Sequence, residues 1–273
     1  MSYITTSDGV HLHFKDVGKG RPVVLIHGWP LTGDMWEKQV IALVDAGYRV
    51  ITYDRRGFGL SGHPIHCYSY DTLTDDLATL INSLDLYDAT LVGFSMGGGE
   101  VARYLSRYGT KRIAKAVLLA SIVPFLLKTS DNPDGVPESV LDGIKQSIRA
   151  DRFDFLENFI PSFYGDSSLL RSVSKGVLNW SFSLACMASP MATIDCVDTW
   201  GKTDLRPDLQ AFTLPTLILH GSADANVPPE FSSKKAAELI PGAIYKEYKG
   251  AAHGLFFTHA DQVNEDLIEF LSA

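Results

Sequence analysis

The sequence predicts an α/β protein, with a mostly parallel central sheet flanked by helices and interrupted by a mainly helical insertion. Short apolar runs alternate with amphipathic stretches over most of the 273 residues, as repeated strand–helix units require. The alternation fails between about residues 122 and 212 and then resumes. Hydrophobic residues make up 45% of the chain and charged residues 21%, which is typical of a folded globular protein.

The first half of the chain supplies most of the expected strands. The run 22–26 (PVVLI) is continuously apolar, as expected of a strand covered on both faces. Residues 10–16 instead alternate polar and apolar side chains, which predicts a half-exposed strand. The remaining elements expected here are strands at 48–53, 90–94 and 113–120, and helices at 34–45, 71–84 and 96–108.

The second half divides into an irregular part and a regular part. Residues 122–212 hold seven of the fourteen phenylalanines and several short helical patches, which predicts a helical cap insertion. After them the pattern predicts a strand at 214–220, a helix near 229–239, a strand at 243–248 and a helix at 260–271. We therefore expect residues 1–121 and 213–273 to form one α/β core.

The charge and composition of the chain limit the kinds of molecule that we expect it to bind. The formal charge is −8 and the isoelectric point is near 5.4, a balance that disfavours binding to nucleic acid. The longest uncharged apolar run, 116–127, is too short to cross a bilayer, and the first residues lack the pattern of a signal peptide. Three scattered cysteines without metal-ligand spacing suit a reducing compartment. We expect a cytoplasmic protein that binds no metal, nucleic acid or membrane.

The sharpest motif is the G-x-S-x-G pentapeptide 93–97 (GFSMG), between an expected strand and an expected helix. A tight turn there forces the serine into strained torsions, and the flanking glycines relieve the crowding. The turn lifts the hydroxyl of Ser95 above the sheet, at a helix N-terminus that favours negative charge. Ser95 is therefore the expected nucleophile.

A serine nucleophile needs a base, and the base needs an orienting acid. His253 follows the last expected strand, and Asp224 follows the strand before it, which reproduces the order serine, acid, histidine. The competing histidines have simpler interpretations, His27 and His220 as core residues and His259 as a structural or capping residue. Asp195 and Asp198 fall in the insertion, where surface or capping roles are expected.

Stabilising an oxyanion requires backbone N–H donors. Met96 directly follows the nucleophile, and Trp29 follows Gly28 in the loop after an early strand. We expect the N–H groups of Trp29 and Met96 to form the oxyanion hole, because Pro30 has no N–H. We expect Pro30 to hold that loop and help to direct a carbonyl inward.

These motifs together resemble the α/β-hydrolase superfamily, and within it the bacterial arylesterase and cofactor-free (non-haem) haloperoxidase, or perhydrolase, group, which includes some γ-lactamases. The resemblance runs essentially end to end. In having proline at position 30, the sequence resembles the haloperoxidase and perhydrolase members of this group. The segments that carry the resemblance are 27–30 (HGWP), 54–61 (DRRGFGLS), 93–99 (GFSMGGG), 220–224 (HGSAD) and 252–254 (AHG).

The resemblance implies a serine hydrolase of small esters with no cofactor. Hydrogen peroxide in place of water would yield a peracid that oxidises halide. The expected partners are a small ester, a carboxylic acid with hydrogen peroxide, or a lactam. Self-association is left open, since no motif fixes a symmetry. The expected pocket comprises Pro30, Phe125, Phe159, Phe163, Trp200 and Val227, with Phe153, Phe155 and Phe182 as further aromatic candidates from the insertion.

Other readings stay open at this point. A lactam or amide hydrolase uses the same three residues. Enzymes with a carboxylate nucleophile are disfavoured by serine at position 95. In a different class, a non-catalytic binding protein on a hydrolase fold would be expected to lack one member of the triad.

Overall fold

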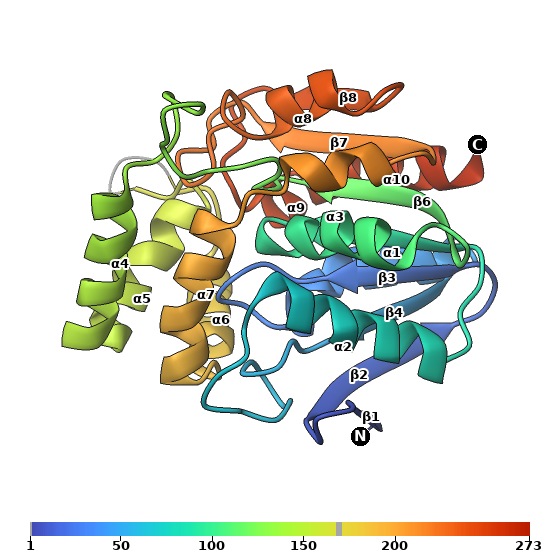
Figure 1. The fold of residues 1–273 in the computed structure, drawn as a ribbon, viewed down its shortest axis with the longest axis horizontal. Coiled ribbons are helices and arrows are strands. Elements are labelled where there is room, and N and C mark those ends of the chain that lie inside the picture. Colours follow the sequence, from blue (N-terminus) through green and yellow to red (C-terminus); the bar gives the residue numbers. More distant parts are fainter. Residues whose placement is uncertain (1, 168–170) are drawn as a thin grey trace.

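The computed structural model describes residues 2–167 and 171–273, and within them eight strands form one sheet (Figure 1). The strand order is β1-β2-β4-β3-β5-β6-β7-β8, with β1, β2 and β4 paired antiparallel and all other neighbours parallel. The strands are β1 (Ser2–Thr5), β2 (His11–Gly18), β3 (Pro22–Ile26), β4 (Arg49–Tyr53), β5 (Ala89–Phe94), β6 (Ile113–Leu119), β7 (Thr216–Gly221) and β8 (Ile244–Tyr248).

The central strands are apolar on both sides because helices cover both faces of the sheet. In β3, Val24 and Ile26 join one core cluster, while Val23 and Leu25 join the cluster on the opposite face. Helices α2 (Tyr70–Ser83) and α3 (Met96–Tyr108) pack on the first face. Helices α1 (Glu37–Asp45), α9 (Leu255–Thr258) and α10 (Ala260–Ser272) pack on the second face. The short helix α8 (Ser233–Leu239) completes the first face.

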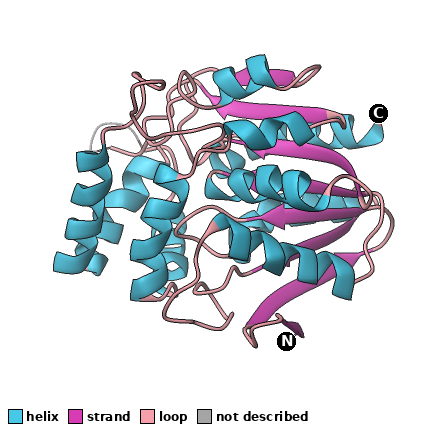
Figure 2. Ribbon diagram, in the orientation of Figure 1, coloured by secondary structure: helices cyan, strands magenta, loops and turns pink. Residues whose placement is uncertain are grey.

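Among the described residues, four α-helices lie between β6 and β7 in the chain and stand beside the sheet rather than on its faces (Figure 1). The arrowheads of the parallel strands point toward them (Figure 2), so the insertion stands at the edge where loops of α/β proteins build sites. Hydrogen bonds join it to the core, from Ser189 N to Gly57 O (2.8 Å) and from Thr199 Oγ1 to Tyr68 O (2.8 Å). The helices are α4 (Glu138–Ala150), α5 (Arg152–Phe163), α6 (Lys175–Cys186) and α7 (Pro190–Lys202), followed by the 3-10 helix η2 (Arg206–Ala211).

The expected fold class is confirmed, and the expected strands and helices agree with the structure to within a few residues. The exceptions are short elements. The sequence analysis missed β1 and α9, and the helix expected at 34–45 begins as a 3-10 turn, η1 (Gly33–Trp36), capped by the Thr32 hydroxyl. Such short elements carry too few residues to show a period.

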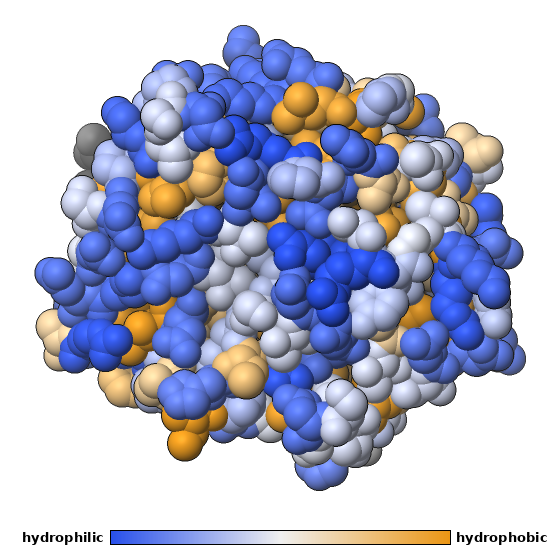
Figure 3. Space-filling view, in the orientation of Figure 1, coloured by the Kyte–Doolittle hydropathy of each residue, from blue (hydrophilic) through white to orange (hydrophobic). Residues whose placement is uncertain are grey.

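The surface has the mixture of polar and apolar side chains that the composition of the chain predicts. On the face shown in Figure 3, apolar side chains form small separate patches among hydrophilic ones. No single helix of the described residues is long and apolar enough to cross a membrane; only α6 and α7 taken together meet that test, and they are bent by 96°.

Candidate active site

Ser95 occupies the turn between β5 and α3 in a backbone conformation that L-residues rarely adopt (φ +52°, ψ −118°). The turn is possible because two glycines let backbones approach closely. A Cβ on Gly93 would lie 2.5 Å from the carbonyl oxygen of Gly97, and a Cβ on Gly97 would lie 2.6 Å from that of Ile26. The glycines of the G-x-S-x-G motif are therefore required by the turn that presents the serine.

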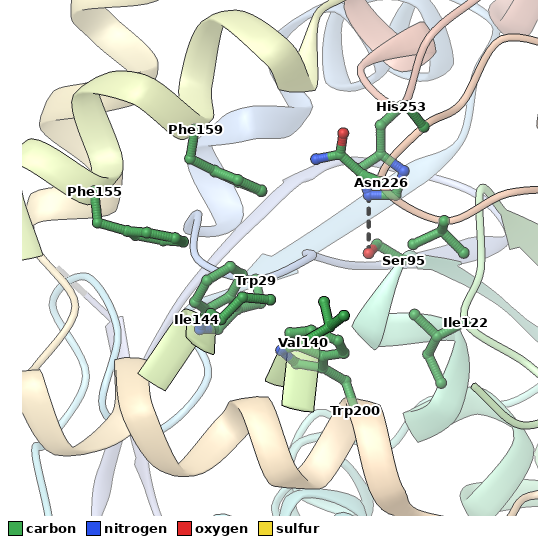
Figure 4. Close-up of a pocket in the computed structure, with 12 residues that line it drawn as sticks. Trp29, Ser95, Ile122, Val140, Ile144, Phe155, Phe159, Trp200, Asn226 and His253 are labelled. Atoms are coloured by element: carbon green, nitrogen blue, oxygen red, sulfur yellow. Dashed lines mark hydrogen bonds between the residues drawn. The ribbon is translucent and has the colours of Figure 1, made fainter. Parts of the chain in front are cut away.

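Three side chains from distant parts of the chain meet at this turn. Ser95 Oγ lies 3.0 Å from His253 Nε2 (Figure 4). On the other side of the ring, His253 Nδ1 lies 2.6 Å from Asp224 Oδ2. Because a carboxylate only accepts hydrogen bonds, Nδ1 carries the ring hydrogen and Nε2 is left to accept the serine hydroxyl proton. The imidazole is held in place by Phe94 and Phe163, whose ring centroids lie 4.9 and 5.0 Å from its own.

Asp224 is buried and its carboxylate has four hydrogen-bond donors around it. Oδ1 accepts from the backbone N–H groups of Asn226 (2.9 Å) and Val227 (2.8 Å), and Oδ2 faces both His253 and His220. Burial by itself would raise the pKa of Asp224, but the charge of His253 and the hydrogen bonds from both histidines hold it well below its usual value. Asp224 is therefore a fixed negative charge behind His253.

His220 is closer to the site than the sequence analysis expected. It is fully buried and its hydrogen bonds are satisfied, as expected of a core histidine, with Ser233 Oγ at Nδ1 and Val227 O 2.8 Å from Nε2. However, its Nε2 also lies 3.0 Å from Asp224 Oδ2. Nothing local in the sequence distinguishes this histidine, because the contact depends on how the loop after β7 folds back.

The two residues expected to supply the oxyanion donors both lie next to the turn at Ser95. Met96 is the first residue of α3, where a helix leaves its N–H without an intrahelical partner. Trp29 lies in the loop after β3, one residue beyond Gly28, and a Cβ on Gly28 would lie 3.1 Å from Ser95 Cβ. In residues 2–167 and 171–273, neither N–H group donates to another protein atom. Both N–H groups are thus available to a bound oxygen.

Buried polar groups hold the loop that carries Trp29. His27 Nδ1 donates to Gly28 O (2.9 Å), and His27 Nε2 accepts from Arg55 N (3.0 Å). Burial lowers the pKa of His27 well below its usual value, so it stays neutral in this role. The Arg55 guanidinium donates to His27 O (2.6 Å) and pairs with the buried carboxylate of Glu100, which also accepts from Tyr53.

A cavity of about 260 Å³ opens beside Ser95 and is mostly apolar (Figure 4). Its walls come from α4, α5 and α7 of the insertion and from the loops after β3, β6, β7 and β8. Such a space suits a small, largely uncharged molecule. The residues that line it are Trp29, Ser95, Ile122, Val140, Ile144, Phe155, Phe159, Trp200, Ala225, Asn226, Val227 and His253.

Three of the six residues of the expected pocket line this cavity. Phe159, Trp200 and Val227 line the cavity, but Pro30, Phe125 and Phe163 do not. Phe163 packs behind the His253 ring, and Pro30 is buried beside Trp29 outside the wall.

Other aromatic residues of the insertion also separate into two groups. Phe125 lies in a different hollow, where the Arg206 guanidinium sits 4.9 Å from its ring centre. Phe155 lines the cavity, whereas Phe153 is exposed and Phe182 packs against the second core cluster. The pocket expectation missed Ile122, Val140, Ile144, Ala225 and Asn226. The docking of α4 decides that Val140 and Ile144 reach the cavity, and the folding of the loops after β6 and β7 decides it for the other three.

The remaining titratable candidates lie away from Ser95. Asp198 forms ion pairs with Lys145 and Lys202 on the insertion, as expected of a surface residue. His259 precedes α10, and its Nδ1 lies 2.9 Å from Thr258 Oγ1. In the part of the chain that the structure describes, no group of three or more histidine, cysteine or acidic side chains is placed to hold a metal ion.

Comparisons with known proteins agree with this geometry. Residues 21–260 match the family described as the alpha/beta hydrolase fold. The non-heme chloroperoxidase CPO-A1 of Kitasatospora aureofaciens is 44% identical and the bifunctional esterase/perhydrolase DCH of Acinetobacter calcoaceticus is 38% identical, with 99% or more of each chain covered. The crystal structure of a bromoperoxidase from Bacillus anthracis superimposes over 100% of both chains with a TM-score of 0.96 and 47% identity. The chain therefore belongs to the α/β-hydrolase family, in the group that contains the non-heme haloperoxidases.

Proposed function

We propose that this protein hydrolyses small uncharged carboxylic esters through an acyl-enzyme on Ser95. The observation that carries the proposal is the hydrogen-bonded series from Ser95 Oγ through His253 to Asp224, at the wall of an apolar cavity. A serine hydroxyl is a weak nucleophile until a base takes its proton, and this series supplies the base and orients it.

In the first half-reaction, His253 Nε2 takes the Ser95 proton while Oγ attacks the ester carbonyl carbon. The oxyanion that forms would bind to the N–H groups of Trp29 and Met96, and each such donor is worth about 10²–10³ in rate. The tetrahedral intermediate then expels the alcohol, which receives the proton from His253. The carboxylate of Asp224 stabilises the imidazolium throughout.

In the second half-reaction, a nucleophile attacks the acyl-enzyme and gives its proton to His253. Water yields the carboxylic acid. Hydrogen peroxide yields a peracid, which with halide and a proton returns the carboxylic acid and hypohalous acid. Support for the peroxide branch comes from the relatives named non-heme chloroperoxidase and bifunctional esterase/perhydrolase.

The insertion and the cellular location complete the proposal. Residues 122–212 would act as a cap over a core formed by residues 1–121 and 213–273, since α4, α5 and α7 supply apolar walls to the cavity. The three free cysteines suit a reducing compartment, and we propose the cytoplasm.

Pre-steady-state hydrolysis of p-nitrophenyl acetate tests the proposal. A burst of nitrophenol equal to the enzyme concentration, followed by slower turnover, is the expected sign of an acyl-enzyme. Repeating the reaction with rising hydrogen peroxide and titrating peracetic acid tests the second branch. Acetate as the only product would remove the perhydrolase branch, and the absence of both burst and turnover would overturn the esterase.

A further inference from the structure

Asn226 is the polar side chain of the cavity wall that the proposed triad does not use. Apart from Ser95 and His253, the other lining residues are aliphatic or aromatic. Neither indole N–H of the wall competes with it. Trp29 Nε1 donates to Thr193 O (3.1 Å), and Trp200 Nε1 is buried beyond the reach of solvent. The Asn226 side chain is half-buried and is accessible from the cavity.

The position of Asn226 is fixed by the triad itself. Its backbone N–H donates to Asp224 Oδ1 (2.9 Å), while Oδ2 of the same carboxylate faces His253. Figure 4 shows the carboxamide extending from beside His253 toward Phe159. Within residues 2–167 and 171–273 it has no protein partner. The free carboxamide therefore faces the cavity from the His253 side.

On the His253 side, the cavity would bind the leaving alcohol and the attacking nucleophile, whereas the oxyanion would bind elsewhere. The oxyanion donors Trp29 and Met96 lie in the loop after β3 and at the start of α3. His253 Nε2 protonates the leaving alcohol in the first half-reaction and deprotonates the nucleophile in the second. By microscopic reversibility the two oxygens pass through the same position. A group beside His253 therefore meets whatever is bonded to that oxygen.

We propose that Asn226 is a specificity-determining residue that binds a second oxygen carried next to the reacting oxygen of the nucleophile. This inference rests on the acyl-enzyme proposed above. Hydrogen peroxide and 1,2-diols carry such a hydroxyl, whereas water and simple alcohols do not. The amide oxygen of Asn226 accepts from that hydroxyl, or its NH₂ group donates to it.

The peroxide step is balanced without any oxidant beyond the peroxide itself. One oxygen of hydrogen peroxide bonds to the acyl carbon, and its proton moves to His253 Nε2. The bond between the acyl carbon and Ser95 Oγ then breaks, and the proton passes from His253 to Ser95. The peracid leaves with the O–O bond intact, and Asn226 holds only the distal hydroxyl during attack.

Partition of one acyl-enzyme between competing nucleophiles tests the assignment. The acetyl-enzyme is formed from p-nitrophenyl acetate in the presence of ethylene glycol and 1-propanol at equal concentration, and in a second series in the presence of hydrogen peroxide. The measured quantities are the ratio of glycol monoacetate to propyl acetate and the ratio of peracetic acid to acetate. Because partition follows acylation, these ratios do not depend on the acylation rate.

Asn226→Leu is expected to lower these ratios about fivefold, the rate equivalent of one net hydrogen bond. Asn226→Ala removes the same carboxamide without added bulk and is measured in parallel, in case the leucine disturbs folding. A fall in only the glycol ratio or only the peroxide ratio assigns the second oxygen to a diol or to peroxide respectively.

The control is Asn158→Leu, the same substitution at an exposed asparagine of α5 outside the cavity wall, which is expected to leave both ratios within about twofold of the wild type. Unchanged ratios in both Asn226 variants, or an equal fall in the Asn158 control, would overturn the assignment. A wild-type protein with no burst would instead contradict the proposed function, so the two failures are distinguishable.

Discussion

The core beneath Ser95 and the helical insertion above it position their parts of the site through different contacts. Below the site, the buried guanidinium of Arg55 donates to Glu100 and to the backbone of His27, in directions that hydrogen bonds fix. Above the site, aromatic rings pack against one another, as Phe155 and Phe159 do with ring centroids 5.7 Å apart. Hydrogen bonds depend steeply on angle, whereas apolar contacts depend mainly on buried area.

This difference separates two tasks of the molecule. The core has to hold Ser95, His253 and two N–H groups to within tenths of an ångström, because a small displacement is costly in rate. The insertion has to provide a shape, which several packings of similar side chains satisfy. Substitutions in the core should therefore have large effects on activity or stability. Substitutions in the insertion should change activity by smaller, graded amounts.

Removing the nucleophile should have the largest effect. Ser95→Ala is expected to lower kcat for p-nitrophenyl acetate by about 10⁴–10⁶ and abolish the burst, while the oxyanion donors leave a residual rate above the uncatalysed reaction. Stopped-flow absorbance measures both quantities, and thermal unfolding checks that the variant is folded. Activity near that of the wild type would refute the role of Ser95.

Breaking the buried ion pair of the core should be the next largest change. Glu100→Gln leaves the Arg55 guanidinium buried without its counter-charge, and it should lower the free energy of unfolding by about 3–5 kcal/mol. The matched control is Glu138→Gln on α4, whose exposed pair with Lys202 should be worth less than about 1 kcal/mol. Urea denaturation measures the free energy of unfolding of both variants. Equal losses would mean that the buried ion pair of the core contributes no more than the exposed pair on the insertion.

The pH dependence of kcat/KM should reflect a single ionisation on the acid side. The pKa of Asp224 lies below its usual value, so this carboxylate stays ionised above about pH 4 and does not titrate in the assay range. Asp224 therefore adds no second ionisation, and the acid limb of the profile should fall by about tenfold per pH unit. A plot of log kcat/KM from about pH 4.5 to pH 8 checks this. A slope of two would show that Asp224 titrates in this range and would contradict its role as a fixed negative charge.

The smallest expected effect comes from the wall of the cavity. Phe159→Leu should enlarge the cavity and change the ratio of kcat/KM values for p-nitrophenyl butyrate and acetate severalfold, about the scale of one or two methylenes. Phe153→Leu is the control, because this residue of the same helix is exposed and lies outside the cavity wall. Equal changes in both variants would mean that α5 affects selectivity by its docking rather than through Phe159.

The fold class and the three central residues follow from local properties of the sequence. Buried parallel strands need continuous apolar runs, and the turn at Ser95 needs glycine at positions 93 and 97, where side chains would collide with backbone. The order Ser95, Asp224, His253 along the chain follows from the order of the strands that precede them.

The tertiary structure alone decided which side chains form the cavity. Phe155, Phe159 and Phe163 are spaced four residues apart on α5 and so share one face of the helix, yet only the first two line the cavity. Phe163 lies one turn further on and packs behind His253 instead. Similarly, His220 and Asn226 reach the site only because the loop after β7 folds around Asp224. Periodicity determines a face of a helix, but the docking of that helix determines what the face meets.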